Sequence, residues 1–121
     1  MPKATGPAKI MGYIAVAILA VMVITGIFRK KIGPSFRRIH GVLAFTFCGL
    51  LTVHAVVFLA EYGAPGVLWL WFGIIAAVIL AAGELAALLR LQNHKLFVRL
   101  HIVAGVSGLI LTAAHWVWIY I

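Results

Sequence analysis

The sequence predicts an all-α protein: a transmembrane four-helix bundle that runs up-down-up-down and is internally duplicated. Three observations support this fold class. Of the 121 residues, 65% are hydrophobic, which leaves too few polar residues to cover a small soluble domain. The apolar residues form four runs of about 20 residues, the length that crosses a bilayer. Residues 12–60 also align with residues 73–121 without a gap, so the chain consists of two copies of one helical hairpin.

The four predicted helices are separated by short segments that contain helix-breaking or polar residues. We expect the helices at about 9–29, 36–60, 66–91 and 97–121. The first connection contains Gly33 and Pro34, which stop one helix before the next begins. Short connections force neighbouring helices to be antiparallel. We therefore expect a single domain over residues 1–121, with the first repeat at about 9–60 and the second at about 66–121.

Positive charge is concentrated at one end of the predicted bundle. The chain has 10 Lys and Arg against 2 Asp and Glu, a net charge of +8. The cations of the first and third connections are Arg29, Lys30, Lys31, Arg37, Arg38, Arg90, Lys95 and Arg99. Only Lys3 and Lys9 lie on the opposite side. Because cationic loops stay in the cytoplasm, we expect both termini outside a bacterial or archaeal cytoplasmic membrane, and no nucleic-acid partner.

The duplication places histidine on histidine. His40 aligns with His101 and His54 with His115, so each repeat contains one His-x13-His helix. Fourteen residues of helix span about 21 Å, and both imidazoles project from nearly the same face. In an up-down-up-down bundle the two histidine helices run parallel. His40 then faces His101, and His54 faces His115, as the axial ligands of two stacked, six-coordinate haem irons.

Small residues accompany the histidines on the other two predicted helices. Each repeat can be reflected through its turn, by counting the same number of residues in both directions from the turn. This reflection places Gly26 at the depth of His40 and Gly12 at the depth of His54. The same operation places Ala87 beside His101 and Gly73 beside His115. A flat macrocycle between the histidine helices needs its edges to approach these backbones closely. We therefore include all four small residues among the cofactor-binding candidates.

The histidines also allow simpler interpretations. A histidine within a membrane can be a polar group bonded to a neighbour, and small residues can mark helix packing alone. Zinc or copper would need a third and fourth ligand, and no thiol or carboxylate stands at the right depth. The haems are expected to be non-covalent b-type, since no C-x-x-C-H segment is present. His94, whose repeat counterpart is Gly33, is expected in a solvated loop.

Two parallel helices with His-x13-His, beside a helix with Gly-x13-Gly, resemble the two-haem core of cytochrome b in quinol-oxidising bc complexes. The pattern is also similar to the core of ferric reductases and NADPH oxidases. The resemblance covers essentially the whole chain. No Pro-Glu-Trp-Tyr segment is present, so the quinol oxidation site of bc complexes is not carried over. The basic first connection matches the ferric-reductase orientation. With no flavin or nicotinamide domain here, a reductase activity would need another subunit.

Charged residues near the predicted inner haem have two interpretations each. Arg37, Arg38 and Arg99 stand two or three residues before the inner ligands, where they could bond to haem propionates or simply set topology. Glu84 is the only carboxylate within a predicted span. It is either a quinone or proton site, or the partner of a nearby arginine.

The sequence therefore predicts transmembrane electron transfer through two bis-histidine haems. The chain would be the membrane subunit of a larger redox or respiratory complex, with lipid, redox subunits or cytochromes and a quinone as the candidate partners. Any quinol oxidase or reductase activity would need partner subunits. The alternative is a haem-free helical scaffold or assembly subunit.

Overall fold

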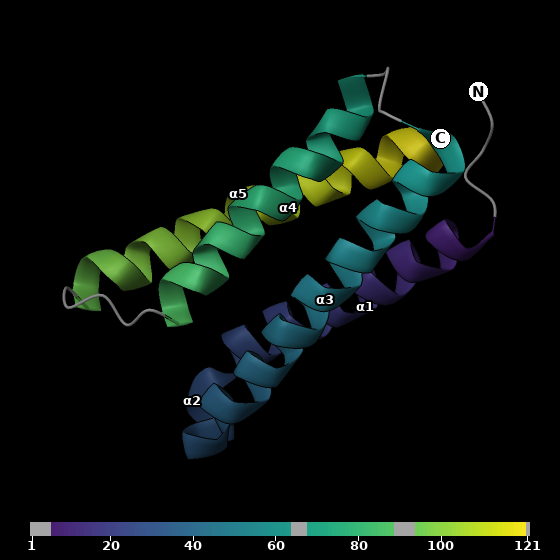
Figure 1. Cartoon of the computed structure of the whole chain (residues 1–121). Helices are drawn as coiled ribbons and strands as arrows, with labels where there is room; N and C mark the ends of the chain where they lie inside the picture. Colours follow the sequence, from purple (N-terminus) through teal and green to yellow (C-terminus); the bar gives the residue numbers. More distant parts are fainter. Residues whose placement is uncertain (1–5, 64–67, 89–93, 121) are drawn as a thin grey trace. The chain divides into compact units, whose positions relative to one another are not determined.

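The computed structural model describes residues 6–63, 68–88 and 94–120, and this part of the chain contains helices and no strand (Figure 1). In chain order the elements are α1 (Pro7–Ile27), α2 (Arg29–Ile32), the 3-10 turn η1 (Gly33–Ser35), α3 (Phe36–Tyr62), α4 (Leu68–Leu88) and α5 (His94–Tyr120). The all-α class and the four long helices are thereby confirmed. The up-down-up-down bundle and its insertion into a membrane stay predictions.

The chain divides into two compact units, Pro2–Gly63 and Ala64–Ile121. The division falls in the predicted connection between the repeats, so each repeat forms a hairpin of its own. In each hairpin the first half of one helix lies beside the last half of the next: Gly12 lies near His54, and Gly73 near His115. Each hairpin is therefore antiparallel. A single domain formed by both stays a prediction.

Glycines shape both ends of α3 in the first hairpin. Gly33 follows α2 with a φ of 68°, a left-handed conformation that the absence of a side chain permits. Pro34 then lies in η1, and α3 begins at Phe36. At the other end Gly63 has a φ of 77°, and its N–H donates to the carbonyl of Leu59 at 2.9 Å. This bond satisfies one of the final carbonyls of α3.

Each hairpin has a narrow interior seam. In the first hairpin the buried side chains are those of Ala8, Ala15, Leu19 and Met22 on α1, and Ala44 and Phe47 on α3. In the second, Leu80 of α4 fits over Gly108 of α5, and a Cβ added to Gly83 would lie 2.9 Å from the Cβ of Ala104. Small residues at such positions let two helix backbones approach closely, which drives helix association in lipid.

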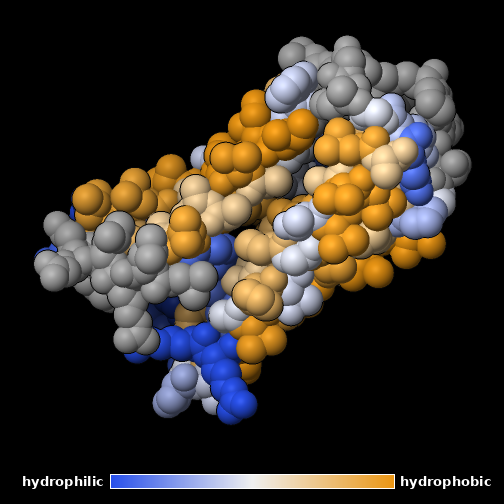
Figure 2. Space-filling view, viewed as in Figure 1, coloured by the Kyte–Doolittle hydropathy of each residue, from blue (hydrophilic) through white to orange (hydrophobic). Residues whose placement is uncertain are grey.

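Apolar side chains cover the outer faces of the helices. Phe45 is 82% exposed and Ile27 70% exposed, and Figure 2 shows hydrophobic residues over much of the visible surface. Within the described residues, three segments are long and apolar enough to cross a membrane, namely Pro7–Ile27, Arg29–Tyr62 and Lys95–Val117, and Trp71–Ala86 is a shorter apolar helix. Such exposure is unfavourable in water but suits contact with lipid tails. The chain is thus compatible with an integral membrane protein.

Candidate functional site

His54 lies on α3 and turns its ring toward the start of α1. Its Nδ1 is 2.9 Å from the carbonyl oxygen of Ala8, a hydrogen-bonding distance. A carbonyl oxygen only accepts, so Nδ1 carries the proton and donates. In the neutral ring this leaves the lone pair on Nε2, the atom that would bind a metal. Gly12 permits the approach, because a Cβ there would lie 3.4 Å from Cε1 of His54.

His101 makes the corresponding bond in the second hairpin. Its Nδ1 donates to the carbonyl of Gly83 on α4 at 3.2 Å, so Nε2 of the neutral ring is again the atom with the lone pair. The reflected repeat pairs this histidine with Ala87, one turn further along α4, whose side chain lies outside the described residues. The repeat does not point to Gly83, because the counterpart of Gly83 is Met22, a large residue.

His115 packs directly against α4. A Cβ added to Gly73 would lie 2.8 Å from both Cε1 and Nδ1 of the ring and 3.1 Å from Nε2. No real Cβ fits at that distance, so the imidazole occupies the place that a side chain at position 73 would fill. This contact agrees with the pairing of Gly73 and His115 that the reflected repeat predicts. The role of Gly73 as space for the macrocycle edge stays a prediction.

His40 lies in a different setting from the other three ligands predicted for iron. The ring of Phe36, one turn earlier on α3, lies 5.0 Å from its own ring, centroid to centroid. On the α1 side, a Cβ added to Gly26 would have no described heavy atom within 4 Å. The space expected beside the inner layer is therefore open at Gly26, whereas the imidazoles themselves fill the space beside Gly12 and Gly73.

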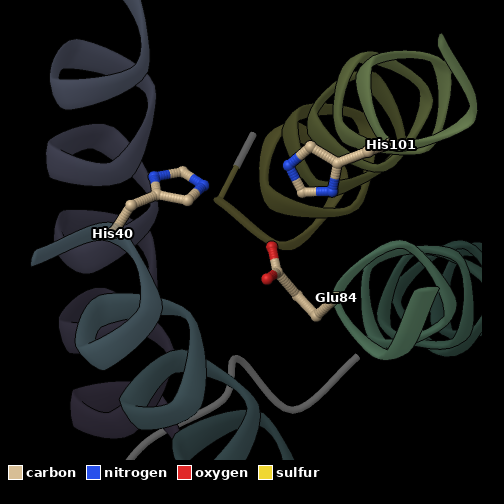
Figure 3. A group of neighbouring side chains, drawn as sticks. All are labelled: His40, Glu84 and His101. Carbon is tan, nitrogen blue, oxygen red and sulfur yellow. The ribbon is translucent and has the colours of Figure 1, made fainter. Parts of the chain in front are cut away.

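Glu84 and His101 lie close together within the second hairpin. Glu84 reaches from α4 and His101 from α5, and a carboxylate oxygen of the one lies within 4.8 Å of a ring nitrogen of the other (Figure 3). Both side chains are partly buried. Figure 3 also shows His40 on α3 of the first hairpin. Of the arginines that could pair with Glu84, Arg90 lies outside the described residues. The expectation that no carboxylate stands at the depth of the histidines is wrong for Glu84, while its quinone or proton role stays a prediction.

The arginines predicted to meet haem propionates are exposed. Arg37 and Arg38 lie in the first turn of α3, and Arg99 lies in the second turn of α5. Cations near the start of a helix oppose its dipole, so these arginines do not stabilise the helix ends where they stand. Their position suits an external anion or a topology signal, the two roles that the sequence allows. The expectation of a loop at His94 is wrong: α5 begins at His94, three residues before the predicted start at 97, and the side chain of His94 lies outside the described residues.

No protein-family model, curated protein or solved structure matches the chain. Its function is therefore inferred from its own residues. Each hairpin contains one His-x13-His pair on a single helix, and each predicted pair of ligands contains one imidazole that donates through Nδ1 to a backbone carbonyl. Imidazoles held in this way are suited to bind a metal through Nε2. Haem binding by these histidines stays a prediction.

Proposed function

We propose that the chain is a small membrane cytochrome that binds two non-covalent b-type haems and moves electrons across the bilayer. The iron ligands would be His40 with His101 and His54 with His115. The observation that carries the proposal is the duplicated His-x13-His pattern, in which His54 and His101 each donate Nδ1–H to a carbonyl of the facing helix. That bond keeps the proton on Nδ1 and leaves the lone pair on Nε2, as a histidine that binds metal through Nε2 requires.

The residues of the chain would hold, orient and enclose the two haems. When bound, haem supplies a carrier for one electron at a time. The two ligands on α3, like those on α5, are separated by about 21 Å along the helix, so that the two layers lie near opposite surfaces of the bilayer. The apolar helices exclude water between the layers. Arg37, Arg38 and Arg99 would neutralise propionates on the inner side.

The surroundings of the protein follow from the same proposal. The basic connections would face the cytoplasm and both termini the outside, by the positive-inside rule. Exposed apolar helices support contact with membrane lipid. The chain would pass electrons between redox subunits, cytochromes or a quinone of a larger complex, with Glu84 marking the candidate quinone or proton site. These partners are proposed from the chemistry of electron transfer and from the resemblance to cytochrome b.

A haem-free scaffold is the second candidate function. Close packing of Gly108 with Leu80 and of Gly83 with Ala104 supports it, because these small residues already have a role in helix packing alone. The interhelical bonds of His54 and His101 also suit a scaffold, as polar groups bonded to a neighbour, but the scaffold hypothesis gives no reason for the duplicated His-x13-His spacing. Haem content separates the two candidates directly.

The experiment is a pyridine haemochrome assay on the purified protein, after expression with sufficient haem. We expect two b-type haems per chain, both extractable with acid acetone because no thioether holds them. The matched control is His94→Ala, which removes the one histidine outside the duplicated pattern and should keep both haems. One haem or none per chain would contradict the assignment.

A further inference from the structure

The carbonyls that accept the hydrogen bonds of His54 and His101 stand at the same spacing from the small residues that the repeat pairs with these histidines. In an α-helix the N–H of residue i donates to the carbonyl of residue i−4. Ala8 stands four residues before Gly12, and Gly83 stands four residues before Ala87. His54 and His101 therefore each donate to the carbonyl one turn before the small residue that the repeat pairs with them. The same geometry appears once in each hairpin.

Side-chain direction explains why a small residue belongs at that position. The Cα–Cβ bond of a helical residue tilts toward the helix N-terminus, so its side chain covers the preceding turn and the carbonyl at i−4. A carbonyl oxygen has two lone pairs, of which the helical bond uses one. With Gly or Ala at position i, the second lone pair is open to a donor from the facing helix. Any side chain larger than a methyl at Gly12 would occupy the place of the His54 ring.

We propose that Gly12 is a positioning residue: it uncovers the carbonyl of Ala8, which fixes the tautomer and ring plane of His54, as the carbonyl of Gly83 does for His101. The inference rests on the proposed function and deepens it: the small residue orients the ligand imidazole in addition to leaving room for haem. A fixed Nδ1–H keeps the Nε2 lone pair available and aimed before any metal arrives, which reduces the ordering that binding requires.

The same rule extends to a third histidine and stops at the fourth. Gly73 lies against His115, and Trp69 stands four residues before Gly73, so the rule assigns the Trp69 carbonyl to His115. His40 does not follow the rule, because a Cβ added to Gly26 would have no described heavy atom within 4 Å. Orientation by a carbonyl is thus proposed for three of the four ligands.

The test is nitrogen-15 NMR of the histidine rings in haem-free protein in neutral detergent micelles, with the His54 signals assigned by their loss in His54→Gln. We expect the Nδ1–H tautomer of His54 in the wild type. Gly12→Leu should lower the ratio of Nδ1–H to Nε2–H forms about fivefold, the equivalent of one hydrogen bond of about 1 kcal/mol. Gly12→Ala should keep the tautomer. Gly49→Leu is the matched control, because Gly49 lies on α3 with open space around it.

Two results would overturn the proposal. One is a wild-type His54 that carries its proton on Nε2, a result that needs no variant and stands even if Gly12→Leu fails to fold. The other is a folded Gly12→Leu protein with an unchanged tautomer ratio. Failure of the proposed function is recognised separately, because the NMR measurement needs no haem. A protein with the expected tautomer and no haem affinity would retain the positioning role and lose the cytochrome assignment.

Discussion

Gly73→Ala should destabilise the second hairpin, whereas Gly12→Ala should not destabilise the first. The added Cβ at position 73 would lie 2.8 Å from two atoms of His115, and the rigid imidazole must swing away from α4 to make room. At position 12 the corresponding distance to His54 is 3.4 Å, close to an ordinary van der Waals contact. The two variants make the same chemical change at aligned positions, so their difference measures the tightness of the histidine contact.

The expected magnitude follows from two opposing terms. Replacing Gly by Ala inside a helix stabilises it by up to about 1 kcal/mol. Overpacking a well-filled contact costs about 1–3 kcal/mol. Gly12→Ala should therefore be neutral or stabilising by up to about 1 kcal/mol, and Gly73→Ala should lie about 1–3 kcal/mol below it in unfolding free energy.

The assay is reversible unfolding of the haem-free protein in mixed micelles, followed by circular dichroism, with haem content measured in parallel. Gly73→Ala should also lose haem from the pair that contains His115. Gly49→Ala controls for the general effect of replacing glycine in a helix, since its Cβ would have no described heavy atom within 4 Å. Equal stabilities for Gly73→Ala and Gly12→Ala would refute the argument, because they would show that His115 does not need the space at position 73.

Three further predictions address the haem layers. His40→Ala should lose the same haem as His101→Ala, and His54→Ala the same as His115→Ala, as judged by the remaining optical and EPR signals; a shared phenotype of His40 and His115 variants would contradict the parallel arrangement. Gly26→Leu should lower haem content at the inner layer without changing the stability of the haem-free protein, because its Cβ points into open space; unchanged haem content would show that no haem edge lies there. The inner haem, kept by His54→Ala, should titrate at a higher reduction potential than the outer haem, kept by His40→Ala. The reason is that Arg37, Arg38 and Arg99 disfavour the ferric charge by about 1–2 kcal/mol, on the order of 60 mV per 1.4 kcal/mol. The opposite order would show that local charge does not set the potentials.

The helices could be predicted because apolar length and breakers determine them almost alone. The second predicted helix, 36–60, agrees with α3 at Phe36–Tyr62, and the first, 9–29, agrees with α1 at Pro7–Ile27 to within two residues. Pro34 and the left-handed Gly33 interrupt the helix between α2 and α3. The duplication in turn predicts two hairpins, which the structure has. How the hairpins pack together depends on side-chain fit between them, which neither hydropathy nor loop length specifies.

The site was predictable to within one turn. Reflection through a short turn predicts which residues share a depth, and it places Gly12 by His54 and Gly73 by His115, where the structure has them. It cannot identify the acceptor of the histidine hydrogen bond, because that acceptor is a backbone carbonyl one turn before the residue that the reflection pairs with the histidine. The repeat also hides Gly83, since the equivalent position in the first hairpin is occupied by a methionine.

The difference between the two hairpins bears on how the proposed cytochrome would distinguish its two haems. Identical repeats would hold His40 as they hold His101, yet no described atom lies within 4 Å of a Cβ added to Gly26, the residue that the repeat pairs with His40. In the second hairpin the carbonyl of Gly83 accepts a hydrogen bond from Nδ1 of His101. Gly83 itself stands where the first repeat has the large residue Met22. The predicted inner pair thus combines histidines in unlike settings, one from each hairpin, whereas His54 and His115 of the outer pair each lie against a glycine. Because hydrogen bonding of the ring nitrogen away from the metal changes how strongly a histidine donates to iron, divergence of these small residues would let the proposed cytochrome tune two haems separately while keeping the same ligands.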